Sequence, residues 1–205
     1  MKGFIVSLSG VRDEDLIVTT LEENRIGRYY RFYGARHSIL QLGYLIDYEE
    51  EDEGRGYMPR LRSVTHLPFD WLYERDRLMV WHHFVTLFER HLRDTENLDR
   101  FYFDTLYGAA LKWGRQNPAR IVLDSYISIL LEEGRLHPLT HCHICERPLG
   151  GEISLMRALI PAHPECIFAP SIGRKSLESY FDTGKSIWLE DWEVEYLYSV
   201  IKRGF

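Results

Sequence analysis

The segment HPLTHCHIC at residues 137–145 decides how the second half of the chain is expected to fold, together with HPEC at residues 163–166, which follows after seventeen intervening residues. All three cysteines of the protein lie in these two pieces. A CxxC knuckle followed by a second ligand pair with the same spacing is how a chain wraps a tetrahedral Zn²⁺ ion. We therefore predict one structural zinc ion per chain, bound by four side chains that leave no position for water: Cys142, Cys145, His163 and Cys166.

Two alternative roles for the cysteines fit the pattern less well. A structural disulfide is disfavoured because the number of cysteines is odd and a Cys-x-x-Cys bridge is strained. A thioredoxin-like redox site would need a βα context, whereas the flanking sequence is rich in proline and histidine. Nearby histidines could replace one of the four ligands, although each is an ordinary residue for a solvated loop: His137, His141 and His143.

A catalytic zinc ion is the main competing hypothesis for this segment. The HPE sequence at residues 163–165 has the H-x-E pattern of zinc deaminases, which also use a P-C-x-x-C motif. A deaminase-like hydrolytic enzyme would bind zinc through Cys142, Cys145 and His163 and use Glu165 as the proton shuttle. In this chain the two motifs come in the reverse order and no proline precedes Cys142. The pattern therefore favours a non-enzymatic protein.

Composition and charge narrow the classes of protein further. The 205 residues are 45% hydrophobic and 27% charged, which is typical of a soluble globular protein. No stretch approaches the roughly 18 apolar residues that a membrane span needs, and we expect neither a membrane association nor a secretory signal. Clustered cysteines in such a chain favour the cytoplasm. The formal net charge of −6 does not by itself favour binding to nucleic acid. Five of the acidic residues, however, are concentrated in the run EEEDE at residues 49–53, so the local distribution of charge is more informative than the net charge.

Two periodicities divide the chain. Alternating and β-branched patterns predict five short strands, near residues 4–9, 15–21, 26–33, 40–48 and 57–67. Five strands are too few for a sandwich and right for a small OB-fold barrel. Helical spacing then predicts helices near residues 71–93, 98–113, 118–134, 176–181 and 189–202. We predict an α+β multidomain protein, with an OB-fold DNA-binding domain at 1–67 and an all-α helical domain at 68–205 that contains a zinc loop at 137–168.

Several pieces of the sequence are shared with one known family. They are Gly3–Val6, Arg12–Thr19, Gly34-Ala35-Arg36, Leu61–His66, and the CxxC of Cys142 and Cys145 with Cys166. Together with the order of barrel, helices and zinc loop, they resemble the RecO family of bacterial DNA repair and recombination mediators. The resemblance covers most of residues 1–168 and is poor after Pro170. His163 stands at a metal position where the family more commonly has a fourth cysteine.

The resemblance implies a function as well as a fold. It implies a barrel that binds single- and double-stranded DNA, and a protein that anneals complementary strands during recombinational repair after DNA damage. It also implies cooperation with RecR to load RecA onto DNA coated with single-stranded-DNA-binding protein, and a cytoplasmic, nucleoid-associated location. A third hypothesis is an interaction adaptor whose barrel binds a partner's peptide, with only incidental contact to DNA.

The DNA-binding residues are expected on the barrel, because an OB groove combines a cationic track with aromatic rings for base stacking. Alternation in IGRYYRFY, residues 26–33, places Tyr29, Arg31 and Tyr33 on one face and Arg28, Tyr30 and Phe32 on the other. One face must fill the barrel, and we expect the face of Tyr29, Arg31 and Tyr33 to lie outside. The expected DNA contacts are Arg12, Arg28, Tyr29, Arg31, Tyr33, Arg36, His37, Arg60 and Arg62.

Overall fold

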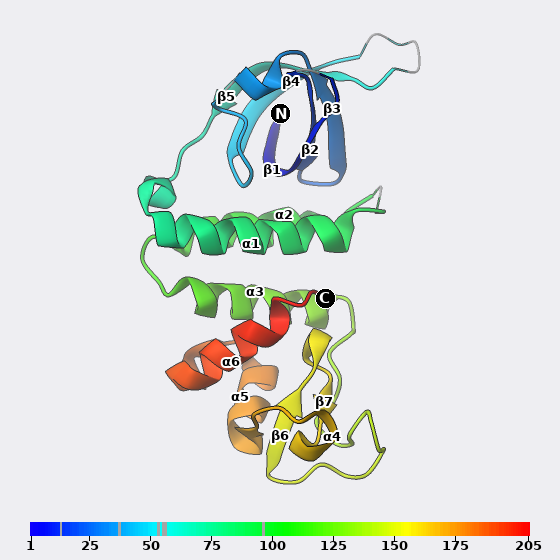
Figure 1. The fold of residues 1–205 in the computed structure, drawn as a ribbon, viewed down its shortest axis with the longest axis vertical. Coiled ribbons are helices and arrows are strands. Elements are labelled where there is room, and N and C mark those ends of the chain that lie inside the picture. Colours follow the sequence, from blue (N-terminus) through cyan, green and yellow to red (C-terminus); the bar gives the residue numbers. More distant parts are fainter. Residues whose placement is uncertain (13, 37, 53, 55–56, 96) are drawn as a thin grey trace. The chain divides into compact units, whose positions relative to one another are not determined.

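The computed structural model describes residues 1–205 except 13, 37, 53, 55–56 and 96. The chain forms two compact units, Met1–Gly114 and Arg115–Phe205. The first unit contains a β-barrel and two long helices, and the second contains the remaining helices and a small sheet (Figure 1).

The first unit begins with a closed five-stranded barrel in which neighbouring strands follow the order β1-β2-β3-β5-β4. All neighbours pair antiparallel except β3 and β5, which are parallel. This closed barrel confirms the predicted OB-type architecture. The strands are β1 (Lys2–Gly10), β2 (Leu16–Leu21), β3 (Ile26–Arg31), β4 (Leu45–Glu51) and β5 (Arg60–His66), and the short 3₁₀ helix η1 (Gly34–Arg36) follows β3.

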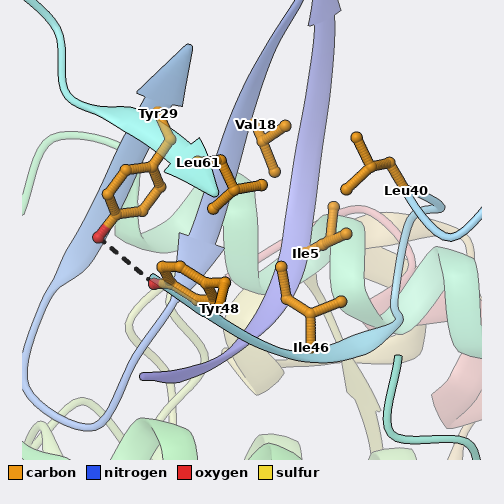
Figure 2. Close-up of a cluster of buried hydrophobic side chains, with 7 residues drawn as sticks. All are labelled: Ile5, Val18, Tyr29, Leu40, Ile46, Tyr48 and Leu61. Atoms are coloured by element: carbon orange, nitrogen blue, oxygen red, sulfur yellow. Dashed lines mark hydrogen bonds between the residues drawn. The ribbon is translucent and has the colours of Figure 1, made fainter. Parts of the chain in front are cut away.

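The interior of the barrel is filled by side chains that alternate with outward-facing ones along each strand. The largest of them are two tyrosines, Tyr29 and Tyr48, whose hydroxyl oxygens lie 3.3 Å apart. Burying each apolar side chain of such a cluster stabilises the fold by about 1.5–3 kcal/mol. Figure 2 shows the complete cluster: Ile5, Val18, Tyr29, Leu40, Ile46, Tyr48 and Leu61.

A buried carboxylate lies against these tyrosines. Glu22, just after β2, is only 5% exposed, and its Oε1 accepts hydrogen bonds from the hydroxyls of Tyr29 at 2.7 Å and Tyr48 at 2.6 Å. Its Oε2 accepts a hydrogen bond from Nε of Arg25 at 2.8 Å. A Cβ atom at Gly27 would lie 2.0 Å from Glu22 Oε1, so only glycine leaves room for the carboxylate. Because the charge is paired and hydrogen-bonded, its burial is tolerated.

The helices of the first unit pack on the barrel through tryptophans. Trp81 is fully buried, donates a hydrogen bond from Nε1 to the carbonyl of Gly43 at 2.9 Å, and contacts Phe4 of β1 with ring centroids 5.9 Å apart. The compact unit includes the barrel together with these helices and ends at Gly114, whereas the sequence prediction placed a domain boundary after residue 67. The elements are the 3₁₀ helix η2 (Asp70–Tyr73), α1 (Arg75–Leu92) and α2 (Arg100–Lys112).

The second unit is helical, as predicted, with an inserted metal loop and a three-stranded sheet of order β7-β6-β8 that the sequence prediction did not contain. The sheet was missed because its strands are two to four residues long, too short to show alternation. The elements are α3 (Pro118–Glu132), β6 (Glu152–Leu155), η3 (Arg157–Leu159), β7 (Pro161–Ala162), α4 (Pro164–Ile167), β8 (Ile172–Gly173), α5 (Arg174–Thr183), η4 (Ser186–Trp188) and α6 (Asp191–Ile201).

The core of the second unit forms around α3. Asn117 caps this helix by accepting a hydrogen bond from the amide of Ala119 at 2.9 Å, and Pro118 occupies its first turn. Tyr126 stacks on Phe205 with centroids 4.2 Å apart. The predicted apolar face of α3 is buried throughout: Ile121, Val122, Tyr126, Ile129 and Leu130. Among the helices that the structure describes, none combines the length and apolar content needed to span a membrane.

Candidate metal centre and candidate nucleic-acid interface

Four side chains from two separate turns meet in the second unit. Cys142 and Cys145 come from the turn before β6, His163 immediately precedes α4, and Cys166 lies within α4. Their ligand atoms all lie within 4.8 Å of one another, which is the spacing of a site that could hold a metal ion. The structure therefore brings together the four ligands that the sequence predicts, and Cys₃His is a donor set that suits Zn²⁺.

The turn around Cys142 has the backbone that a metal knuckle needs. The amide of Glu146 donates to the carbonyl of Cys142 at 2.8 Å, and Glu146 adopts a left-handed conformation with φ of 61°. The amides of Ile144 and His163 both point at Sγ of Cys142, at 3.4 Å. These N–H···S contacts favour the thiolate, which is the form that binds a metal.

The orientation of His163 is set by a contact on the far side of its ring. Nε2 lies 3.0 Å from the carbonyl oxygen of Pro148, so this nitrogen carries the proton and donates it to the carbonyl. Nδ1 then presents a lone pair towards Cys145 Sγ at 3.3 Å and Cys166 Sγ at 3.8 Å. Such a second contact is what fixes the tautomer and direction of a metal-binding histidine.

The surroundings of the cluster shift the pKa values of its thiols in opposite directions. Arg147 Nε lies 3.5 Å from Cys145 Sγ, and this contact lowers the pKa of Cys145 to about 6. Loss of solvation and the two neighbouring thiols raise the pKa of Cys166 to about 11. A divalent cation would satisfy all three sulfurs at once, because it stabilises every coordinating thiolate.

A single arginine holds the loop that carries the first two ligands. Arg174, the first residue of α5, donates to the carbonyls of Leu139 at 2.8 Å, Leu149 at 2.7 Å and Gly150 at 3.0 Å. Its guanidinium also lies 3.3 Å from Glu178. The metal loop is therefore tied to α5 independently of any ion.

The arrangement favours a structural over a catalytic role. A catalytic zinc site keeps one position open for water, whereas Cys166 stands within the cluster as a fourth ligand. Glu165 is exposed on α4. The histidines considered as substitutes lie outside the four-ligand group, and the rings of His137 and His143 instead contact each other, with centroids 4.5 Å apart.

On the barrel, the expectation that Tyr29 faces solvent is wrong. Its side chain is 1% exposed and points into the interior, because its hydroxyl is bound by Glu22. The outward face of β3 and of the turn after it therefore carries Arg28, Tyr30 and Phe32. Tyr33 is exposed all the same, since β3 ends at Arg31 and Tyr33 turns out with φ of 51°.

Arg31 is also placed differently from the prediction. Its side chain is partly buried, and NH1 donates to the carbonyl of Leu61 at 2.7 Å. Loss of solvation lowers the pKa of its guanidinium. Arg31 thus connects β3 to β5 as part of the barrel wall.

Aromatic side chains and an arginine line a hollow on the outside of the barrel. Its volume is about 360 Å³, and Tyr57 at its edge is 71% exposed. The rings of Tyr30 and Phe32 meet edge to face at 4.9 Å, and the Arg60 guanidinium lies 5.0 Å from the centre of the Phe32 ring. The sequence reasoning did not assign a DNA contact to Tyr57, and the available signal was an aromatic residue three positions before the arginine that begins β5. The hollow is lined by Tyr30, Phe32, Tyr57, Met58 and Arg60.

A second hollow of about 420 Å³ adjoins the first, because Met58 lines both. Its walls include small polar side chains of β1 and β2, such as Ser7 and Thr19, and two arginines, Arg28 and Arg93. Arg93 is held by Glu89 at 2.9 and 3.0 Å. We name the two hollows together the outer groove, defined by Arg28, Tyr30, Phe32, Tyr57, Met58, Arg60 and Arg93.

The remaining predicted contacts surround this groove or lie apart from it. Arg12 is exposed in the turn between β1 and β2. Arg36 in η1 forms an ion pair with Glu14, and its guanidinium lies 5.3 Å from the centre of the Tyr33 ring. Arg62 pairs with Glu51 at 2.8 Å. His37 lies outside the described residues.

The fold and the two sites define a class of protein: an OB-type barrel followed by helices, with a Cys₃His cluster in the helical unit. Residues 1–72 match the family model described as RecO N terminal. Residues 1–72 are thus similar to the N-terminal domain of the RecO family, and the five-stranded barrel followed by helices fits this similarity. A comparison with curated proteins gives no match. The family match indicates a role in DNA repair and recombination, with nucleic acid as the general class of partner.

Proposed function

We propose that the protein is a non-enzymatic mediator of recombinational repair that binds single-stranded DNA in the outer groove. The observation that carries this proposal is the aromatic hollow, in which Tyr57 and Phe32 are 71% and 43% exposed beside Arg60. Exposed aromatic rings on a barrel surface offer stacking platforms to unpaired bases, and stacking contributes about 1–3 kcal/mol per base.

Local charge supports DNA binding despite the net charge of −6. Screening limits the reach of each charge to about 8 Å at physiological salt, so the groove arginines act on a bound strand while distant carboxylates hardly do. Arg28 lines one half of the groove together with Arg93, which is held by Glu89 of the same wall, and Arg60 lines the other half. A strand that follows β3 along its outer face would meet cations at both ends of the aromatic stretch.

The RecO relationship extends the proposal to partners. The protein would anneal complementary strands and assist RecA loading with RecR on DNA covered by single-stranded-DNA-binding protein, in the cytoplasm at the nucleoid. Double-stranded DNA would be a second ligand. The barrel at 1–67 would supply DNA binding, and residues 68–205 would supply the helical part with its metal loop.

In this proposal the ion at the Cys₃His cluster is Zn²⁺ with a structural role. The donor set, the amides aimed at Cys142 and the contact from Pro148 to His163 support this assignment. The ion would join the turn of Cys142 and Cys145 to α4, and so stabilise the small sheet between them.

The test is a titration of a fluorescent 20-nucleotide single strand at two salt concentrations, together with a strand-annealing assay. Binding should weaken with salt by a log–log slope of about −0.7 per neutralised phosphate. Phe32→Ala and Tyr57→Ala should each cost about 1–3 kcal/mol of affinity without changing the slope. Arg60→Ala and Arg36→Ala should instead reduce the slope, each by about 0.7.

Tyr73→Ala is the matched control, because Tyr73 is 90% exposed in η2 and does not line the groove. Salt-independent binding would support the peptide adaptor in place of the DNA mediator. Unchanged affinity in both Phe32→Ala and Tyr57→Ala would show that the outer groove is not the binding site.

A further inference from the structure

Arginines of the outer groove and its surroundings are already paired with carboxylates of the same barrel. Glu51, the last residue of β4, lies 2.8 Å from Arg62 and 3.8 Å from Arg60. Glu14 pairs with Arg36 beside the exposed ring of Tyr33. These cations are therefore neutralised before any DNA arrives.

A phosphate of DNA can break ion pairs of this kind, but the carboxylate lowers the affinity of the arginine for that phosphate. The side chains of Arg62 and Glu51 are 47% and 45% exposed, and exposed pairs contribute little to stability, so a phosphate can displace the carboxylate. The displaced Glu51 then remains within a few ångströms of the phosphate and repels it. A phosphate contact at Arg60 or Arg62 thus brings less affinity than a contact to an unpaired arginine.

The aromatic contacts carry no such penalty, because a base stacks on Phe32 or Tyr57 without displacing a carboxylate. Single-stranded DNA can use these rings and can direct its flexible backbone away from Glu51. Duplex DNA keeps its bases stacked inside, carries a charge about every 1.7 Å, and has a persistence length of about 150 base pairs. A duplex therefore depends on contacts to the groove arginines, Arg60 among them, and cannot bend away from the carboxylate of Glu51 beside Arg60.

From these contacts we infer that Glu51 is a specificity-determining residue that makes the outer groove select unpaired over duplex DNA. The inference rests on the proposed function, since it assigns the substrate preference of that same groove. Its physical basis is that Glu51 lowers the attraction for phosphates, on which the duplex relies, and leaves base stacking untouched.

The test compares Glu51→Gln with Glu49→Gln, two substitutions that remove the same charge from the same strand. Glu49 is exposed and accepts a hydrogen bond from the Ser63 hydroxyl at 2.7 Å, so it provides a control for net charge. A 20-nucleotide single strand and a 20-base-pair duplex of the same sequence are titrated by fluorescence anisotropy. We expect Glu51→Gln to raise duplex affinity about five-fold and single-strand affinity less than about two-fold. Glu49→Gln should change both by the same small factor.

An equal change of both affinities in Glu51→Gln, or the same result in both variants, would overturn the inference while leaving single-strand binding intact. A wild-type protein that binds the duplex as tightly as the single strand would also overturn it. Failure of the wild type to bind single strands at all would instead reject the proposed function, and the inference with it. Thermal melts of both variants exclude misfolding as the cause of any change.

Discussion

The barrel and the metal loop are stabilised in opposite ways. The barrel has a core of seven buried side chains from all five strands and the loop before β4, and a buried Glu22 that is hydrogen-bonded to its walls. The segment at 137–168 contains short strands and turns, tied by four potential metal ligands and by Arg174. A core spread over many contacts tolerates the loss of any one contact, whereas a loop held by few contacts does not. The comparison predicts where single substitutions should have the largest effects.

The largest effect is expected from Cys145→Ser. Metal binding in such a site is coupled to folding, with apparent free energies of about 10–16 kcal/mol in zinc-finger peptides, so loss of one thiolate should remove several kcal/mol. We expect metal content to fall and the transition of the second unit to drop by more than about 10 °C. Plasma mass spectrometry and calorimetry measure the two effects.

His143→Ala is the control for this substitution, because His143 is an exposed residue of the same loop outside the ligand group. Purified wild-type protein without metal, or a Cys145→Ser variant that melts like the wild type, would refute the structural site. A Cys166→Ser variant that keeps both its metal and its stability would support the catalytic alternative with Glu165.

Glu22→Ala tests how much the buried carboxylate contributes to the stability of the otherwise apolar barrel interior. The substitution removes the carboxylate that accepts hydrogen bonds from the hydroxyls of Tyr29 and Tyr48 and from Nε of Arg25, although Arg25 keeps its ion pair with Glu50 at 2.6 Å. We expect this loss to cost about 2–4 kcal/mol in the free energy of unfolding. Urea denaturation of the full chain measures this cost. Glu23→Ala is the neighbouring control, since Glu23 is exposed and its ion pair with Arg100 is 3.4 Å long. We expect this substitution to lower the free energy of unfolding by less than about 0.5 kcal/mol.

The smallest effect concerns pH and His66, the last residue of β5. Its ring stacks on Tyr44 at 3.9 Å, and its Nε2 is buried without a hydrogen-bond partner among the described residues. Loss of solvation lowers the pKa of His66 below 6.5. The barrel is then fully stabilised above pH 6.5 and loses this contribution as the pH falls through the lowered pKa. His66→Phe should flatten the dependence of the urea midpoint on pH between 7.5 and 5; an unchanged profile would contradict this role.

Spacing was the most informative feature of the sequence. Each ligand pair keeps its two-residue spacing regardless of the length of the loop between the pairs. The four ligands could therefore be predicted together: Cys142, Cys145, His163 and Cys166. Likewise, alternation predicted the five barrel strands, and the 3.6-residue period predicted α3 and its buried face. Both signals depend only on residues near each other in the chain.

The orientation of β3 could not be predicted in that way. Alternation shows that Tyr29 and Tyr30 face opposite sides, but only the partners of Tyr29 decide which side is inside. Those partners are Glu22, in the turn before β3, and Tyr48, on β4. The residues next to Tyr29 in the sequence do not reveal these contacts. The outer groove was missed for the same reason, since Tyr57 and Phe32 line one hollow only once the barrel has closed.

The contact from Arg174 to the metal loop has a consequence for synthesis on the ribosome. The last ligand, Cys166, precedes Arg174 by eight residues, which at about 5–20 residues per second is an interval of about 0.4–1.6 s. The nascent chain therefore holds a complete ligand set before the side chain that binds the carbonyls of Leu139, Leu149 and Gly150 has been made. The four ligands are thus complete in the chain without Arg174, and its hydrogen bonds to the three loop carbonyls would slow the escape of an ion that these ligands hold.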